Sequence, residues 1–258
     1  MIRFVAASLL VLLTFLTITS HAQQLYGRTD QYGAAGNAYQ QGPPQDNVII
    51  ILDASDSMNE RISGSNESKF EAAKRVILET LRTMPPNVNV GLRVYGHKLG
   101  SGFRVSGFGF MTGGEMCHQS ELLVPLATNN RAQIASQLVN IHAVGKTPIT
   151  YSLEQAVNQD FFGHPGKKTI ILVSDGRETC SYNPCDVAVD MVRHGVDVRI
   201  NTIGLATHDR VADDQLKCIA LSTKGKFYSV DTAAQLAKSL QDSSQIYTDV
   251  QAKIYPGN

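Results

Sequence analysis

The chain lacks an excess of charge of either sign. Its 23 lysine and arginine residues are matched by 23 aspartate and glutamate residues, so the formal net charge at pH 7 is zero. Interfaces with nucleic acids and with anionic membranes depend on clustered basic side chains. The composition therefore gives no reason to expect a nucleic acid or a membrane surface as partner, and it is otherwise that of an ordinary globular protein.

Several motifs of catalysis and nucleotide binding are also missing. The chain contains no Gly-x-Gly-x-x-Gly, no phosphate-binding loop and no His-Glu-x-x-His zinc-protease motif. Ser174 follows an apolar run as a hydrolase nucleophile does, but Leu172 stands where the nucleophile motif needs glycine. Ser55 stands where an aspartyl phosphatase would carry its second aspartate. We therefore expect neither nucleotide binding nor catalytic residues.

The N-terminus has the pattern of a secretory signal peptide. Arg3 precedes an apolar stretch from Phe4 to about Thr17, and Ser20-His21-Ala22 is a small-x-small cleavage site. The apolar stretch is shorter than the roughly 20 residues that a bilayer requires, which disfavours an uncleaved anchor helix. No cysteine directly follows it, which disfavours a lipid anchor. We expect residues 1–22 to be removed and the protein to be exported, to the periplasm or the extracellular space.

Beyond the leader, the chain predicts a linker, one folded domain and a short tail. Residues 23–46 are rich in Gln, Gly, Tyr and Asn and have no aliphatic run, as in a flexible linker. Short apolar runs then alternate with helical patterns over residues 47–250, and residues 251–258 form the tail. Strands are expected at 48–52, 90–95, 121–126, 169–173, 196–203 and 227–230. Helices are expected at 69–84, 131–141, 186–194, 213–223 and 232–247, and another begins with Thr147 as N-cap and Pro148 at its first position.

This alternation predicts an α/β fold with a doubly wound, mostly parallel central sheet flanked by helices. In such sheets, ligands bind beyond the carboxyl ends of the strands. Hard oxygen donors follow two of the predicted strands, and another, Thr147, stands at the start of a predicted helix. The five are Asp53, Ser55, Ser57, Thr147 and Asp175. Two carboxylates and three hydroxyls suit Mg2+, or Mn2+ or Ca2+, and leave at least one coordination position for water or a partner's oxygen.

The three segments that carry these donors resemble the metal-ion-dependent adhesion site of von Willebrand factor type A domains. Asp53-Ala54-Ser55-Asp56-Ser57 resembles the Asp-x-Ser-x-Ser signature of that site, and Gly145-Lys146-Thr147-Pro148-Ile149 resembles the loop with its coordinating threonine. Ser174-Asp175-Gly176 resembles the third loop. The resemblance extends from about Asn47 to Tyr247 and is greatest to bacterial exported members; Arg177, where an acidic residue is common, departs from it.

The resemblance implies a metal-dependent protein-binding module of the adhesion type. The bound cation stays coordinatively unsaturated until an Asp or Glu carboxylate of a partner protein completes it, and family members often couple this event to a shift of the final helix. We expect a monomer without enzymatic activity. Two alternatives stay open: a metal-assisted hydrolase, for which Glu178 is the nearest to a general base, and a structural module in which the ion only stabilises the fold.

The four cysteines form an even set, as in proteins of oxidising compartments. They are Cys117, Cys180, Cys185 and Cys218, and two disulfide bonds are the first interpretation. A zinc site is the alternative, because His118 and His194 lie near cysteines in the sequence. Order along the predicted sheet favours Cys185 with Cys218 and Cys117 with Cys180, while the pairing of Cys180 with Cys185 and Cys117 with Cys218 stays open.

Overall fold

A six-stranded sheet forms the centre of the protein. The computed structural model describes residues 45–98, 116–180 and 182–254, and the expected leader, most of the linker and the Gly-rich segment 99–115 lie outside these ranges. The strand order is β3-β2-β1-β4-β5-β6. The strands are β1 (Asn47–Asp53), β2 (Asn89–Tyr95), β3 (Ser120–Ala127), β4 (Lys168–Ser174), β5 (Arg199–Leu205) and β6 (Phe227–Val230). Neighbouring strands pair in parallel except β2 and β3, which are antiparallel.

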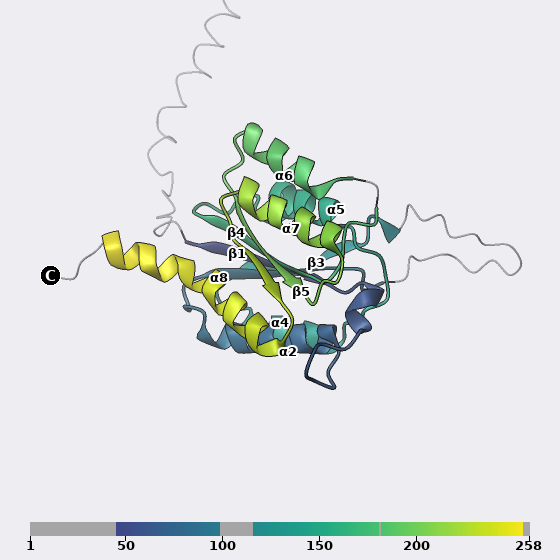
Figure 1. Cartoon of the computed structure of the whole chain (residues 1–258). Coiled ribbons are helices and arrows are strands. Elements are labelled where there is room, and N and C mark those ends of the chain that lie inside the picture. The colour runs from purple at the N-terminus through teal and green to yellow at the C-terminus, as the bar shows by residue number, and fades with distance from the viewer. Residues whose placement is uncertain (1–44, 99–115, 181, 255–258) are drawn as a thin grey trace, which may run out of the picture. The chain divides into compact units, whose positions relative to one another are not determined.

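Helices cover both faces of the sheet (Figure 1). One face packs against α2 (Lys69–Thr83), α4 (Arg131–Val139) and α8 (Ala233–Ile254). The other packs against α5 (Ile149–Gln155), α6 (Pro184–Arg193) and α7 (Arg210–Ser222). Two short segments complete the described elements, a 3-10 turn η1 (Asp56–Asn59) and a π-helical turn η2 (Ala156–Asp160) that continues α5. The predicted doubly wound, mostly parallel fold is confirmed.

The apolar run of β1 explains the two layers. Its side chains alternate between the faces, with Val48, Ile50 and Leu52 in one core and Ile49 and Ile51 in the other. All five are fully buried. Burying a side chain of this size is worth roughly 1.5 to 3 kcal/mol, so this strand stabilises the packing of both helix layers on the sheet.

Several element boundaries differ from those expected, mostly because of capping. Thr147 is not an N-cap: Pro148 holds that position, and α5 begins at Ile149. The strand expected at 196–203 is shifted, since β5 begins at Arg199 and ends at Leu205, and α8 continues past Tyr247 to Ile254.

The helices α6 and α7 each begin earlier than expected. Asn183 accepts a hydrogen bond from the Cys185 amide before α6, and Asp209 accepts one from the Val211 amide before α7. These are Asn and Asp caps of the usual kind, which the apolar periodicity alone did not indicate.

Candidate metal centre

Three chain segments meet at the carboxyl ends of β1 and β2. The Val144 amide donates to the Ala54 carbonyl at 3.0 Å, and the Asp56 amide donates to the Gly145 carbonyl at 3.1 Å. Gly96, directly after β2, lies between these segments with a φ of +71°. A β-carbon at Gly96 would lie 2.7 Å from the Lys146 carbonyl oxygen. The loops are therefore packed backbone against backbone, which leaves little freedom for the side chains that they carry.

Four of the five predicted donors form a continuous chain of contacts. Asp53 is fully buried, and its Oδ1 accepts a hydrogen bond of 2.7 Å from the Ser55 amide. The Ser55 and Ser57 hydroxyl oxygens are 3.2 Å apart. The Ser57 hydroxyl in turn donates to Asp175 Oδ1 at 2.7 Å. Residues separated by more than a hundred positions in the chain thus share one small cluster.

The fifth donor, Thr147, lies on the same cluster. A β-carbon built on Gly176 would lie 3.7 Å from the Ser57 hydroxyl oxygen and 3.9 Å from the Thr147 hydroxyl oxygen, so both hydroxyls flank this glycine. Thr179 holds Thr147 in place: the Thr147 amide donates to the Thr179 hydroxyl at 3.0 Å, and the Thr179 amide donates to the Thr147 carbonyl at 3.2 Å. The structure therefore brings all five predicted donors to one edge of the sheet.

The environment of Asp53 differs from that of an exposed carboxylate. Its second oxygen, Oδ2, accepts a 2.6 Å hydrogen bond from the Ser174 hydroxyl. Burial, followed by the negative charge of Asp175, raises the pKa of Asp53 from 3.8 to about 6. A cation between the two carboxylates would remove this repulsion, so the donor set and its charge both fit a hard divalent ion.

A buried lysine is the main feature that the sequence interpretation missed. Lys69 Nζ donates to Asp175 Oδ2 at 2.9 Å and to Glu60 Oε2 at 2.7 Å, and Lys69 is only 3% exposed. Burial lowers the pKa of Lys69, but the hydrogen bonds to Glu60 and Asp175 outweigh it and the pKa is raised. The sequence gives one indication of this role, because Lys69 is the first residue of α2. The helix dipole disfavours a positive charge at this end, so a lysine there needs an acidic partner.

The cysteines form disulfide bonds in the favoured arrangement. Cys117 pairs with Cys180 at a Cα–Cα distance of 5.3 Å, and Cys185 pairs with Cys218 at 5.4 Å. Within the described residues, no group of three or more His, Cys, Asp or Glu side chains is arranged to hold a metal ion. The zinc alternative therefore has no support in the structure. Arg177, the departure from the family pattern, lies 3.5 Å from Asp209 in an exposed ion pair.

Comparison with known proteins identifies the family. The model of the von Willebrand factor type A domain matches residues 47–243. The chain belongs to this family. The uncharacterized protein YwmC of Bacillus subtilis strain 168 is 28% identical over 221 residues, which cover 85% of this chain and 92% of YwmC.

Solved structures show the same fold at lower identity. The von Willebrand factor domain of the type V pili tip protein Mfa5 from Porphyromonas gingivalis has a TM-score of 0.60 at 15% identity and covers 81% of this chain and 96% of its own. Proximal thread matrix protein 1 from the mussel byssus, with a zinc-occupied adhesion-site motif, has a TM-score of 0.57 at 18% identity, and the match covers 79% of this chain and 46% of that chain.

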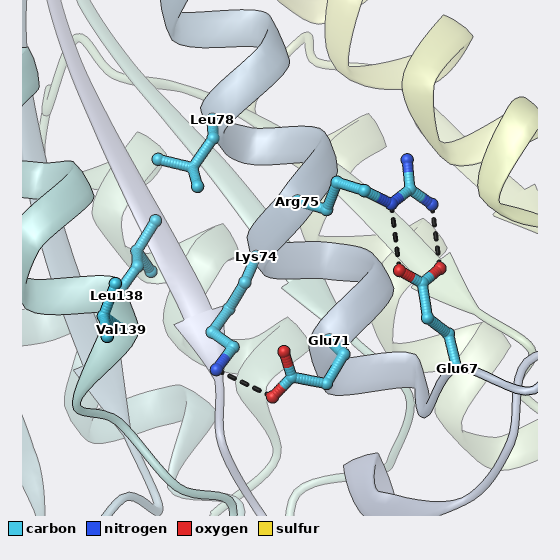
Figure 2. Close-up of a pocket in the computed structure, with 7 residues that line it drawn as sticks. All are labelled: Glu67, Glu71, Lys74, Arg75, Leu78, Leu138 and Val139. Carbon is cyan, nitrogen blue, oxygen red and sulfur yellow. Dashed lines mark hydrogen bonds and ion pairs between the residues drawn. The ribbon is translucent and has the colours of Figure 1, made fainter.

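Besides the candidate metal centre, this von Willebrand factor type A domain has a groove of about 400 Å3 between α2 and α4. Figure 2 shows the three apolar residues that line it, Leu78 on α2 and Leu138 and Val139 on α4. Its charged side chains pair with one another, Lys74 with Glu71 at 2.7 Å and Arg75 with Glu67 at 2.9 Å. The groove thus has its own charge balance. In the described part of the chain, no helix is both long and apolar enough to cross a membrane.

Proposed function

We propose that this protein is an exported, metal-dependent binding module. Its five oxygen donors hold Mg2+, with Mn2+ or Ca2+ as alternatives, and an Asp or Glu carboxylate of a partner protein completes the coordination. The proposed ligands are Asp53, Ser55, Ser57, Thr147 and Asp175. The observation that carries the proposal is the contact chain from Asp53 through Ser55 and Ser57 to Asp175, built at the edge where ligands of parallel sheets bind.

The surrounding residues orient the proposed ligands. Ser174 and the Ser55 amide hold the two oxygens of Asp53. Lys69 holds one oxygen of Asp175 and thereby leaves the other with Ser57. The ion itself would act as a Lewis acid toward an anionic oxygen of the partner. A pilus tip protein and a byssus matrix protein share the fold, and the latter has a zinc-occupied motif, which supports a binding role. The two disulfide bonds support export to an oxidising compartment.

The contacts of Glu178 bear on the hydrolase alternative. One carboxylate oxygen accepts from the Thr150 amide at 2.8 Å, and the other accepts from the Cys180 amide at 2.7 Å. Burial raises the pKa of Glu178, although these backbone hydrogen bonds oppose the rise. Glu178 thus joins the start of α5 to the loop after β4. A side chain with both oxygens engaged in this way suits loop positioning better than proton abstraction.

The metal is tested by isothermal titration of the disulfide-intact protein with Mg2+, Mn2+ and Ca2+. We expect one site per chain that Asp53→Ala abolishes. Asp56→Ala is the matched control, because Asp56 lies in the same turn but contacts only the Asn59 amide group among the described side chains. Failure of the intact protein to bind any of the three ions would overturn the proposal.

The role of the metal is tested with Thr147→Ala. If the ion serves partner binding, this variant should lose Mg2+-dependent capture of its partner from an envelope extract. Without metal, its melting temperature should equal that of the unmutated protein. Parallel loss of folding and capture would instead favour a purely structural ion.

A further inference from the structure

A second cavity, of about 440 Å3, opens beside the proposed metal centre. Two of its lining residues come from the metal-centre loops themselves: Pro148 directly follows Thr147, and Cys180 lies five residues after Asp175. The Cys117–Cys180 disulfide bond forms part of its wall and ties the segment before β3 to the loop after β4. A peptide whose carboxylate reached the metal would therefore have this cavity within reach of its neighbouring side chains.

Aromatic rings line this cavity. His118 and Tyr151 pack edge to face with ring centroids 5.0 Å apart. Tyr182 is 71% exposed, although tyrosine carries enough apolar surface to favour burial. The faces of such rings carry partial negative charge and attract cations.

The cavity also has acidic side chains in its lining. Glu154, one helical turn after Tyr151 on α5, lines it together with Glu178, whereas no lysine or arginine does. No ion pair or hydrogen bond joins the Glu154 carboxylate to another of the described residues. The groove of Figure 2 is the contrast, since its carboxylates are already paired with basic side chains. The His118 imidazole is the one lining group that can become cationic, so the cavity at Glu154 is complementary to the charge of a lysine or arginine, which its described lining lacks.

We propose that this cavity binds a lysine or arginine side chain of the same partner segment whose carboxylate reaches the metal. The partner then presents an acidic residue with a basic residue close to it in sequence. The inference rests on the proposed function and extends it by naming the second determinant of recognition. The two charges bind at separate places, the carboxylate at the ion and the cation between the rings and Glu154.

Synthetic peptides test the inference. The probe is a fluorescent Gly/Ser heptapeptide with one central Asp, in which Lys, Arg, norleucine or Glu is placed in turn at each flanking position. Affinity for the disulfide-intact protein is measured by fluorescence polarisation with Mg2+ and with chelator. At one flanking position or more, we expect Lys and Arg to bind about 3- to 30-fold more tightly than norleucine, the range for a cation at a partly desolvated aromatic site. Glu at that position should weaken binding.

Two variants assign the preference to the cavity. Glu154→Gln removes the carboxylate and keeps the rings, so it should clearly reduce the ratio of Lys to norleucine affinities while Mg2+ binding by calorimetry stays unchanged. Glu71→Gln, in the groove of Figure 2, is the matched control and should change neither quantity. A preference for Lys that is undiminished in Glu154→Gln would overturn the inference.

The outcomes separate the inference from the function on which it rests. If the norleucine peptides bind only with Mg2+ but basic neighbours give no advantage, the metal-dependent function stands and the basic subsite is wrong. If the peptides do not bind with Mg2+ present, the carboxylate-binding function itself is contradicted, and the subsite with it. Binding of Lys peptides that is unaffected by chelator would show that the two determinants do not act together.

Discussion

The two carboxylates of the metal centre have unlike partners. Asp175 has a full positive charge beside it, the ammonium of Lys69, which is itself held by Glu60. Asp53 is fully buried and has neutral donors beside it, among them the Ser55 amide and the Ser174 hydroxyl. Hydrogen bonds from neutral donors offset burial less than an opposite charge does. Asp53 is thus the position at which a proton would compete with a metal ion bound at the proposed site.

The raised pKa of Asp53 predicts how the metal-free protein responds to pH. Because the folded pKa is about 6 and the unfolded value is 3.8, the folded state holds the proton more tightly between these values. The contribution of Asp53 to stability is therefore fully present below about pH 4 and is lost as the pH rises through about 6. We expect its part of the unfolding free energy to fall by on the order of 2 to 3 kcal/mol from pH 4 to pH 7.

Urea unfolding of the metal-free protein and of Asp53→Asn at pH 4, 5, 6 and 7 checks this. Because the Asn amide stays neutral, the unfolding free energy of the unmutated protein should fall relative to that of Asp53→Asn as the pH rises. Since a metal ion binds the ionised carboxylate, Mg2+ should stabilise the unmutated protein more at pH 7 than at pH 5. A difference that stays constant across this pH range would contradict the assignment.

At the scale of elements, the geometry of the candidate metal centre depends on close packing between loops. The loops that follow β1 and β2 lie against the loop that precedes α5. The Gly145 amide donates to the Gly96 carbonyl at 2.7 Å, and a β-carbon at Gly145 would lie 2.9 Å from the Cα of Gly96. Only residues without a side chain allow such a separation. The glycine pair therefore sets the distance between Ser55 and the loop that carries Thr147.

Substitution of Gly96 tests this contact, and Gly64 provides the matched control. Both residues have φ above +70°, but a β-carbon would meet nothing within 4 Å at Gly64 and would lie 2.8 Å from the Ser55 amide nitrogen at Gly96. Gly64→Ala should cost only the strain of the backbone conformation, roughly 1 to 2 kcal/mol. Gly96→Ala should cost clearly more and should also weaken Mg2+ binding.

Thermal unfolding and calorimetric titration of both variants measure the two effects. Equal losses of stability, or an unchanged affinity for Mg2+ in Gly96→Ala, would show that the loops have room to separate and would contradict this account.

At the scale of the whole molecule, the two disulfide bonds have different places relative to the metal centre. Cys185–Cys218 joins α6 to α7 on one face of the sheet. Cys117–Cys180 joins the segment before β3 to the loop that follows Asp175. The first bond constrains two packed helices, whereas the second constrains the loops around the proposed binding surface.

Removal of either bond should therefore lower the stability of the protein, but the two removals should differ in their effect on peptide binding. Closing loops of 33 and 63 residues restricts the unfolded chain by amounts worth about 3 to 4 kcal/mol in each case. We expect both Cys→Ser double variants to lose stability of this order in urea unfolding. Only the variant lacking Cys117–Cys180 should also lose the preference for basic peptides. If the variant that lacks Cys185–Cys218 also lost this preference, the effect of that bond would not be confined to α6 and α7, and this account would be contradicted.

The sequence by itself determined the fold class and the composition of the candidate site. An apolar run that ends in Asp53, Ser55 and Ser57 indicates a strand buried on both faces, and Ser174-Asp175-Gly176 repeats the pattern in β4. Because parallel strands end at the same edge, the sequence assigns these donors to one edge of the sheet, and the pairing of β1 with β4 brings them together. The order of the cysteines along the sheet favoured the observed pairing but did not exclude its rival.

Only the tertiary structure decided the contacts between side chains that no local pattern relates. The pairing of Lys69 with Asp175, the use of both oxygens of Glu178 as a cap, and the cavity at Glu154 each require residues from separate segments to meet within a few ångströms. Periodicity indicates which face of an element is buried, but it carries no information on which polar group that face meets. For this reason the donors of the candidate site could be predicted from the sequence. The ion pair that balances the charge of Asp175 and the cavity beside the site could not be predicted.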